Sequence, residues 1–439
     1  MNAMTTNFAA RPTRRAVLLG LAGTAASPAF AQRMAPPPTA PVTINFYNYN
    51  LASANYGAQA TRELLAEFMA ANPNIRVEGV PVTSDQMAPR VQADVVAGRI
   101  PDVAQIVFSD LDFVVSNFGV RPLEEIVPPD EWAAHTQGMV PAGLRLGMLN
   151  GRTYGLAYVF STPVLFYNAT IFRAAGLDPD APPRNWEQVK AAALRVREAT
   201  GKHGIYADIF TIFDWLYQAV VLSGGGRVLS EDRRRLTFGE PDAVAPVLVL
   251  RDLVQSGAHP RMNQADAFDA MYGGNMGMLL TTSVIQRALL SAFADRFELR
   301  AAAMPAFGER PARPTNSGSA LVIMARDPAK QRAAWELMKF ATSRRGYTII
   351  TSKIGYLPLR LDIVDDPQYL GEWTRQNPLI RPNLAQLERI EPWQPIPGPN
   401  YRQIARIETG ALNEAVFGDG DPARVLRDAQ QRAQALMPR

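Results

Sequence analysis

The chain has 439 residues, of which 47% are hydrophobic and 20% are charged. This composition is ordinary for a globular protein, and the length suggests two or three domains. The formal net charge is +4, and Arg11, Arg14 and Arg15 carry three of these charges. The rest of the chain is almost neutral, and its charge therefore does not indicate nucleic-acid binding. The absence of cysteine excludes disulfides, thiolate nucleophiles, Cys-ligated zinc and a lipid-anchored N-terminal Cys.

The N-terminus has the pattern of an export signal. Arg14-Arg15 precedes an apolar run over residues 16–26, and Ala29-Phe30-Ala31 fits an A-x-A cleavage site. A membrane anchor is the alternative, but the run contains glycines and is too short to cross a bilayer. The pattern therefore predicts a twin-arginine signal peptide over residues 1–31 and a periplasmic protein that begins at Gln32. Residues 32–41 form a Pro-rich leader.

Strands and helices then alternate in the first part of the mature chain. Hydrophobic periodicity predicts strands around 43–48, 75–80 and 103–108, with helices over 56–70 and from Ser84 to just before Gly98. A strand–helix–strand–helix–strand order indicates a parallel sheet that is covered by helices.

The alternation resumes further along the chain. Strands are predicted at 164–167, 276–280 and 319–324, and helices at 170–175, 186–199, 329–342, 344–353, 367–374, 401–417 and 422–436. Asn185 is expected to cap the helix that begins at Trp186. The sequence thus predicts two α/β lobes with a helical C-terminal portion.

Polar and aromatic residues follow several of the predicted strands. They occur at 48–50, 108–110 and 281–283. Because ligands of open α/β sheets bind beyond the carboxyl ends of the strands, these residues are expected to form a recognition surface.

No catalytic constellation is visible in the sequence. His135, His203 and His259 are isolated, and no H-E-x-x-H, G-x-S-x-G or P-loop motif occurs. We therefore expect a protein that is not an enzyme and that uses no cofactor or metal. A secreted carbohydrate-active enzyme stays open as an alternative, since paired carboxylates for glycoside hydrolysis are distant in sequence.

One segment resembles a known family. Residues 161–187 read STPVLFYNATIFRAAGLDPDAPPRNWE, which is similar to the extracellular solute-binding proteins, family 1, of ABC importers for sugars and related solutes. Asn185 replaces the usual Thr of the family pattern. Further segments agree with this family, namely 72–80, 98–102, 272–283, 317–324 and 355–360.

The resemblance implies an α/β fold of the periplasmic-binding-protein type II kind. It has two discontinuous lobes joined by a hinge, with the ligand cleft between them. Lobe I is expected at 42–152 plus 305–355, and lobe II at 153–304 plus 356–439. The resemblance also implies a monomer that captures a small polar solute by hinge closure and delivers it to membrane permease subunits. The sequence does not distinguish such an importer component from a sensor protein that serves a chemoreceptor without transport.

Members of the family that bind glycerol-3-phosphate give a mixed residue match. Their motif Ser falls on Ser161, but their phosphate-binding Tyr falls near Ser84 and their glycerol-binding Glu near Phe108. Their phosphate-binding Arg falls near Ala405, with Arg402 one turn before it. These departures favour a carbohydrate and leave glycerol-3-phosphate or a glycerophosphodiester as the alternative.

The candidate ligand contacts combine rings, hydroxyls, amides and one cation. Core packing is the alternative for Phe108 and for Trp215, and an exposed helix start is the alternative for Arg402, which suits an anionic group. The predicted ligand-binding residues are Tyr49, Asn50, Ser84, Phe108, Ser109, Ser161, Trp215, Ser283, Ser317, Gly318, Tyr356 and Arg402.

Overall fold

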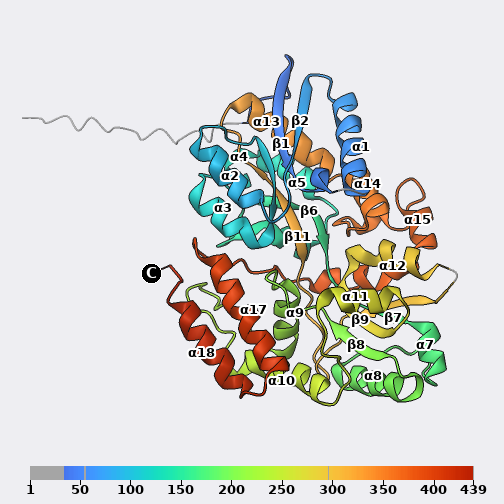
Figure 1. Cartoon of the computed structure of the whole chain (residues 1–439). Coiled ribbons are helices and arrows are strands. Elements are labelled where there is room, and N and C mark those ends of the chain that lie inside the picture. Colours follow the sequence, from blue (N-terminus) through green and yellow to red (C-terminus); the bar gives the residue numbers. More distant parts are fainter. Residues whose placement is uncertain (1–33, 54–55, 295, 439) are drawn as a thin grey trace, which may run out of the picture.

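The computed structural model describes residues 34–53, 56–294 and 296–438. The predicted signal peptide therefore lies outside the described residues. The described chain forms two lobes, one above the other in Figure 1, with strands β6 and β11 reaching toward their boundary. No helix in these ranges has the length and apolar character needed to cross a bilayer.

Lobe I is built on a five-stranded sheet with the order β2-β1-β3-β11-β6. β2, β1 and β3 are parallel, and β11 runs antiparallel to both β3 and β6. The strands are β1 (Val42–Asn48), β2 (Ile75–Pro81), β3 (Val103–Val107), β6 (Gly155–Ser161) and β11 (Ser317–Ile323). The larger helices are α1 (Tyr56–Ala71), α2 (Met87–Val96), α13 (Pro328–Ala341) and α14 (Arg344–Ile354).

Helices cover both faces of the lobe I sheet, as the buried strands require. Phe46 packs with Leu64 and Trp335 on one face, whereas its neighbour Tyr47 packs with Met87 and residues around it on the other. Side chains alternate across a strand, so β1 supplies apolar groups to two separate cores. Burial of β1 on both faces of the sheet explains why the segment TINFYN has apolar residues that point to both sides.

Lobe II is built on a four-stranded sheet with the order β10-β7-β9-β8. β8 is parallel to β9, and β7 is antiparallel to β9 and β10. The strands are β7 (Pro163–Asn168), β8 (His203–Ala207), β9 (Met276–Thr282) and β10 (Leu299–Ala303). The helices are α7 (Ala169–Ala174), α8 (Trp186–Thr200), α9 (Trp215–Gly224), α10 (Pro241–Gln255), α11 (Gln264–Tyr272), α12 (Gln286–Phe293), α17 (Tyr401–Phe417) and α18 (Pro422–Gln434).

Short elements complete the described chain. The α-helical and strand pieces are α3 (Leu111–Asn117), α4 (Leu123–Ile126), α5 (Pro129–Thr136), α6 (Pro141–Leu144), β4 (Met148–Leu149), β5 (Arg152–Thr153), α15 (Gly371–Gln376) and α16 (Arg381–Leu384). The 3-10 turns are η1 (Asn50–Ala52), η2 (Phe108–Asp110), η3 (Arg145–Gly147), η4 (Ser283–Ile285), η5 (Leu361–Ile363), η6 (Pro378–Ile380) and η7 (Leu387–Arg389).

The motif segment 161–187 shapes one edge of lobe II. The Asn168 side chain accepts a hydrogen bond from the Ile171 N–H and caps α7, and the Asn185 side chain accepts from the Gln188 N–H and caps α8. The capping prediction for Asn185 is therefore confirmed. Trp186, next to this cap, is almost fully buried against Phe307.

The chain leaves lobe I later than the sequence predicts. β6 covers residues 155–161 and pairs with β11, so it belongs to the lobe I sheet rather than to a lobe II that begins at 153. The physical reason is the continuous apolar run of β6, which is buried at every position between its neighbours. β6 is followed directly by β7 of the other sheet, and only Thr162 separates them.

Gly318 marks the point at which the chain enters β11. Its φ is +108°, and a Cβ atom there would lie 2.1 Å from the carbonyl oxygen of Val159 on β6. We expect Gly318→Ala to lower the free energy of unfolding by about 2–4 kcal/mol, since both backbone strain and strand separation result. Chemical denaturation of the purified protein measures this loss.

A glycine with a positive φ but open surroundings provides the control. Gly98 has a φ of +75°, and a Cβ atom there would meet no other atom within 4 Å. Gly98→Ala is expected to cost only the backbone term of about 1 kcal/mol. Equal losses in the two variants would contradict the argument from the β6–β11 approach.

Candidate ligand cleft

A cleft of about 500 Å³ lies between the two lobes. This volume is in the range of small-molecule sites. Residues of both sheets and of the connections between them line it. They are Tyr49, Ser84, Val107, Ser161, Asp208, Thr211, Ile212, Phe213, Trp215, Gln264, Thr282, Val284, Ser317, Gly318, Tyr356 and Trp393.

The cleft lies where strands of both lobes end. Tyr49 follows the end of β1, Val107 ends β3, Asp208 follows β8 and Thr282 ends β9. Carboxyl ends of parallel strands are the usual ligand edge of an α/β sheet. The fold therefore brings four strand ends from two sheets to one cavity.

Among the described residues that line the cleft, Asp208 alone has a carboxylate, and none is a Lys, Arg or His. Its carboxylate accepts hydrogen bonds from Thr281 Oγ1 at 2.9 Å and from Gln264 Nε2 at 2.7 Å. Burial raises the pKa of Asp208, and these two donors oppose that effect. Two donors hold the side chain in place, while its negative charge disfavours an anionic ligand nearby.

Aromatic rings form the apolar part of the lining. Trp215 begins α9, and Phe213 lies edge-to-face with Trp393, with ring centroids 6.3 Å apart. Trp393 is fixed by two hydrogen bonds, from its backbone N–H to Asn316 Oδ1 and from Nε1 to Asp214 Oδ1, each at 2.8 Å. Fixed rings beside polar groups are suited to ligands that have both an apolar face and hydroxyls.

Hydroxyl groups line the crossing between the lobes. Thr282 Oγ1 donates to Ser161 Oγ at 2.8 Å, so the end of β9 is bound to the end of β6. Ser317 is the register partner of Ser161 across the β11–β6 pair. Two of the connections between the lobes therefore meet at the floor of the cleft.

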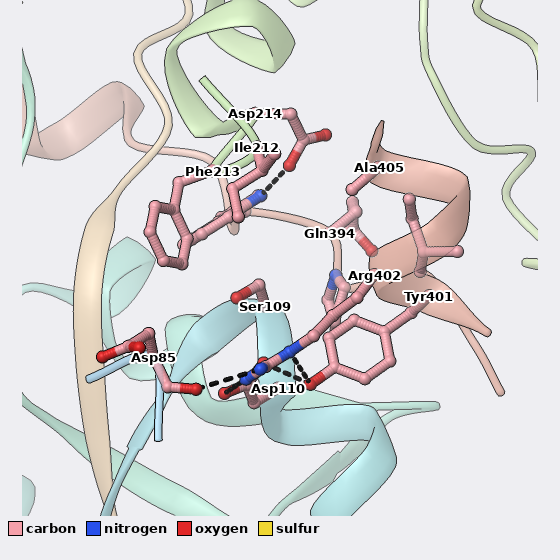
Figure 2. A pocket seen from close by; sticks show the side chains of 13 residues that line it. Asp85, Ser109, Asp110, Ile212, Phe213, Asp214, Gln394, Tyr401, Arg402 and Ala405 are labelled. Carbon is pink, nitrogen blue, oxygen red and sulfur yellow. Dashed lines mark hydrogen bonds and ion pairs between the residues drawn. The ribbon is translucent and has the colours of Figure 1, made fainter. Parts of the chain in front are cut away.

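A second, smaller pocket of about 50 Å³ adjoins the cleft and shares Ile212, Phe213 and Trp393 with it. Figure 2 shows Arg402 of α17 reaching Asp110 of η2, with the Tyr401 ring beside them. Arg402 Nη2 lies 3.1 Å from Asp110 Oδ2, and the Tyr401 hydroxyl donates to Asp110 Oδ1 at 2.6 Å.

This ion pair joins the lobes, because Asp110 lies in lobe I and Arg402 in lobe II. Arg402 Nη1 also donates to the backbone carbonyl of Asp85 at 2.9 Å. A second ion pair joins the lobes close by, between Arg233 and Asp112 with 2.7 Å between Nη2 and Oδ2.

Comparison with known proteins identifies the family. A family model described as bacterial extracellular solute-binding protein matches residues 63–378. The chain belongs to this family. The solute-binding family and the two-lobed fold that the sequence predicts are thereby confirmed.

Individual known proteins resemble this chain over most of its length. The sn-glycerol-3-phosphate-binding periplasmic protein UgpB of Pectobacterium atrosepticum is 24% identical over 359 residues, 78% of this chain and 80% of its own. The cyclic alpha-maltosyl-1,6-maltose binding protein of Arthrobacter globiformis has a TM-score of 0.78 at 20% identity, over 90% of this chain and 99% of its own. UgpB of Mycobacterium tuberculosis, solved with glycerophosphocholine, has a TM-score of 0.75 at 22% identity, over 90% and 98%.

The structure brings seven of the predicted contact residues to the cleft. They are Tyr49, Ser84, Ser161, Trp215, Ser317, Gly318 and Tyr356. Ser109 and Arg402 line the smaller pocket, and Ser283 lines a separate pocket of about 370 Å³ next to α12 and α14. Direct contact with a solute remains a prediction for all of these residues.

Two predicted contacts lie inside lobe I instead. Phe108 is 1% exposed and belongs to the main apolar core; it lies in η2, just beyond β3, and is not among the residues that line the cleft. Asn50 is 4% exposed and lies near the buried Tyr158 hydroxyl, away from the cleft lining. The prediction of ligand contact is corrected for both.

Sequence reasoning missed Asp208, Gln264, Phe213 and Trp393. Asp208 directly follows the apolar segment GIYA of β8, a signal that was readable as a strand followed by a polar end. Trp393 had no local signal, since it lies in a Pro-rich connection without periodicity.

A buried pair of carboxyl groups lies behind the aromatic wall. Asp214 accepts from Trp393 Nε1 and, at 2.7 Å, from Gln218 Nε2. Glu408 of α17 is 1% exposed beside it. Burial first, and then the neighbouring Asp214, raise the pKa of Glu408 well above its usual range. We infer that Glu408 stays protonated in the folded protein at pH values where it ionises in the unfolded chain.

This pair predicts a pH dependence of stability. A raised folded-state pKa means that the contribution of Glu408 to stability is fully present below its unfolded pKa and is lost as the pH rises. We expect Glu408→Gln, which keeps the shape without the ionisation, to gain stability relative to the native chain with rising pH. The gain is up to about 1.4 kcal/mol per pH unit above the unfolded pKa.

Denaturation midpoints between pH 5 and pH 8 measure this difference. Glu414→Gln is the control, because Glu414 is exposed on the same helix. A gap between Glu408→Gln and the native chain that stays constant over this pH range would contradict the prediction.

Proposed function

We propose that this chain is the solute-binding component of an ABC importer and that its solute is a neutral carbohydrate. The observation that carries the proposal is the lining of the cleft, whose described residues supply rings and hydroxyls, one carboxylate and no cation. We further propose that the protein acts as a monomer and hands its solute to membrane permease subunits.

A neutral sugar matches each component of this lining. The rings of Trp215, Phe213 and Trp393 line the cleft and offer apolar contacts for the C–H groups of a sugar. Asp208 and Gln264 offer an acceptor and an amide for hydroxyl groups, and they are already oriented by their mutual hydrogen bond. The sugar-binding structural relative from Arthrobacter globiformis supports this class of ligand.

A glycerol phosphate, the alternative, fits the charges less well. A buried phosphate needs charge-assisted donors, and unpaired buried charge is costly. Asp208 is a negative charge in the cleft, and Arg402 in the adjoining pocket already has Asp110 as its partner. The UgpB relatives keep this class among the candidates to be tested.

The lining also supports a binding role rather than hydrolysis of glycosides. Glycoside hydrolysis commonly uses two carboxyl groups on either side of the scissile bond. Among the described residues that line the cleft, Asp208 alone has a carboxyl group. We therefore propose capture of the intact solute by closure of the lobes, because residues of both lobes face the same cavity.

Two substitutions test the sugar proposal. We expect a neutral mono- or oligosaccharide from a thermal-shift panel to bind, and both Trp215→Ala and Asp208→Asn to weaken it by at least about tenfold, or 1.4 kcal/mol. Calorimetry with the sugar found in the panel measures the affinities. Glycerol 3-phosphate and glycerophosphocholine belong in the same panel.

Matched variants outside the cleft separate binding from general damage. Trp373→Ala and Asp269→Asn alter a Trp on α15 and an Asp on α11. They are expected to retain the native affinity. Tight binding of glycerol 3-phosphate, with no neutral sugar bound, would overturn the sugar proposal.

We also propose export by the twin-arginine route, which the Arg14-Arg15 pair and the Ala29-Phe30-Ala31 site support. Replacement of both arginines by lysine is expected to leave uncleaved protein in the cytoplasm, as fractionation and N-terminal sequencing would reveal. Arg11→Lys is the matched control. Normal periplasmic delivery of the Lys-Lys variant would refute this route.

A further inference from the structure

The small pocket next to the cleft already holds an anionic group of the protein itself. Asp110 is 2% exposed and lies in lobe I, directly after β3. Its carboxylate points across the lobe boundary toward Arg402 and Tyr401 at the start of α17, as Figure 2 shows. The carboxylate thus lies between a guanidinium and a phenol from the opposite lobe.

The contacts of this carboxylate are those that an anionic ligand group would use. Asp110 Oδ2 lies 3.1 Å from Arg402 Nη2, and Oδ1 accepts the Tyr401 hydroxyl at 2.6 Å. Arg402 Nε donates to the same Tyr401 oxygen at 2.9 Å, which orients the phenol toward the carboxylate. Arg and Tyr donors in this arrangement suit a carboxylate or a phosphate oxygen.

Among the described residues that line the pocket, the one positive charge is that of Arg402, which is already paired. The charged residues of this lining are Arg402, Asp110, Asp85 and Asp214. Asp85 accepts from Arg402 through its backbone carbonyl, and Asp214 is bound by Gln218 and Trp393. The guanidinium is thus paired with the Asp110 carboxylate, and the free volume of about 50 Å³ leaves room for water rather than for a phosphate.

The pocket adjoins the cleft, because Ile212, Phe213 and Trp393 line both. It is therefore the neighbouring space that a charged extension of a solute in the cleft would meet. An incoming anion would have to displace the Asp110 carboxylate from Arg402, which leaves a buried charge without its partner.

We propose that Asp110 is a specificity-determining residue: its carboxylate occupies the anion position between Arg402 and Tyr401 and thereby excludes solutes that carry a phosphate or carboxylate group. This inference rests on the proposed solute-binding function and adds the reason for the preference for neutral solutes. Asp110 restricts the solute by charge and by space at the same time.

Removal of the carboxylate tests the proposal. Asp110→Ala removes the charge and opens the space, so acetate and inorganic phosphate, titrated at constant ionic strength with chloride as the reference, should bind this variant saturably. Glycerol 3-phosphate should bind it at least about tenfold more tightly than it binds the native chain. Asp110→Ala combined with Arg402→Met should lose both gains.

Asp112 provides the matched control. It is two residues further on, also buried, and it forms another ion pair between the lobes, with Arg233. Asp112 does not line the pocket. Asp112→Ala therefore breaks an ion pair between the lobes without opening the pocket, and this variant should gain no anion binding. Equal anion binding by the two variants, or none by Asp110→Ala, would overturn the proposal.

Two further measurements keep the outcome interpretable. Asp110→Asn preserves the shape of the side chain and should still gain affinity for glycerol 3-phosphate, which provides the test if Asp110→Ala does not fold. Neutral-sugar affinity, measured on the same variants, reports on the proposed function by itself. Absence of sugar binding throughout would refute the carbohydrate assignment, whereas the anion titrations decide the role of Asp110.

Discussion

The antiparallel pairing of β6 with β11 is the constraint on which the arrangement of the lobes depends. Ser161 ends β6 and is the register partner of Ser317, which begins β11, so two of the connections between the lobes lie side by side. Gly318 permits this approach because a side chain there would overlap the Val159 carbonyl. The cleft forms where these connections diverge into the two sheets, and Ser161, Ser317 and Gly318 line its floor. Closure of the lobes requires only changes near such connections, since each sheet is packed as a unit.

Three buried carboxyl groups lie around the cleft. The structure offsets the energetic cost of burying each of them in a different way. Asp208 receives two neutral donors and lines the cleft. Asp110 is paired with a guanidinium and a phenol from the other lobe. Asp214 receives donors from Gln218 and Trp393, and its neighbour Glu408 has a raised pKa. Low solvent access makes such groups costly unless they are paired or neutral, so their partners also fix the aromatic and polar walls of the site.

This arrangement connects ligand selectivity with lobe closure. Arg402 contributes to both, because its partner Asp110 belongs to the opposite lobe. The Arg233–Asp112 pair also spans the boundary, and Asp112 lies only two residues beyond Asp110. Paired charges at a lobe boundary favour one relative orientation of the lobes, and they do so without contact with the solute. A neutral solute then needs to contribute only hydrogen bonds and ring contacts to binding, and no charge.

The sequence by itself determined the lobed α/β class, most helices and the capped motif around Asn185, because periodicity, caps and turn residues act over a few neighbouring positions. It did not reveal β6, whose seven residues are all buried and therefore lack alternation, and this omission moved the expected lobe boundary to 152.

The tertiary structure alone decided which side chains face the cleft. Val107 and Phe108 are adjacent, apolar and part of the same core, yet only Val107 also lines the cleft. Asp110 and Arg402 are 292 residues apart, and no local pattern connects them. Their pairing depends on how two independently packed sheets meet, which is a property of the assembled core rather than of any segment.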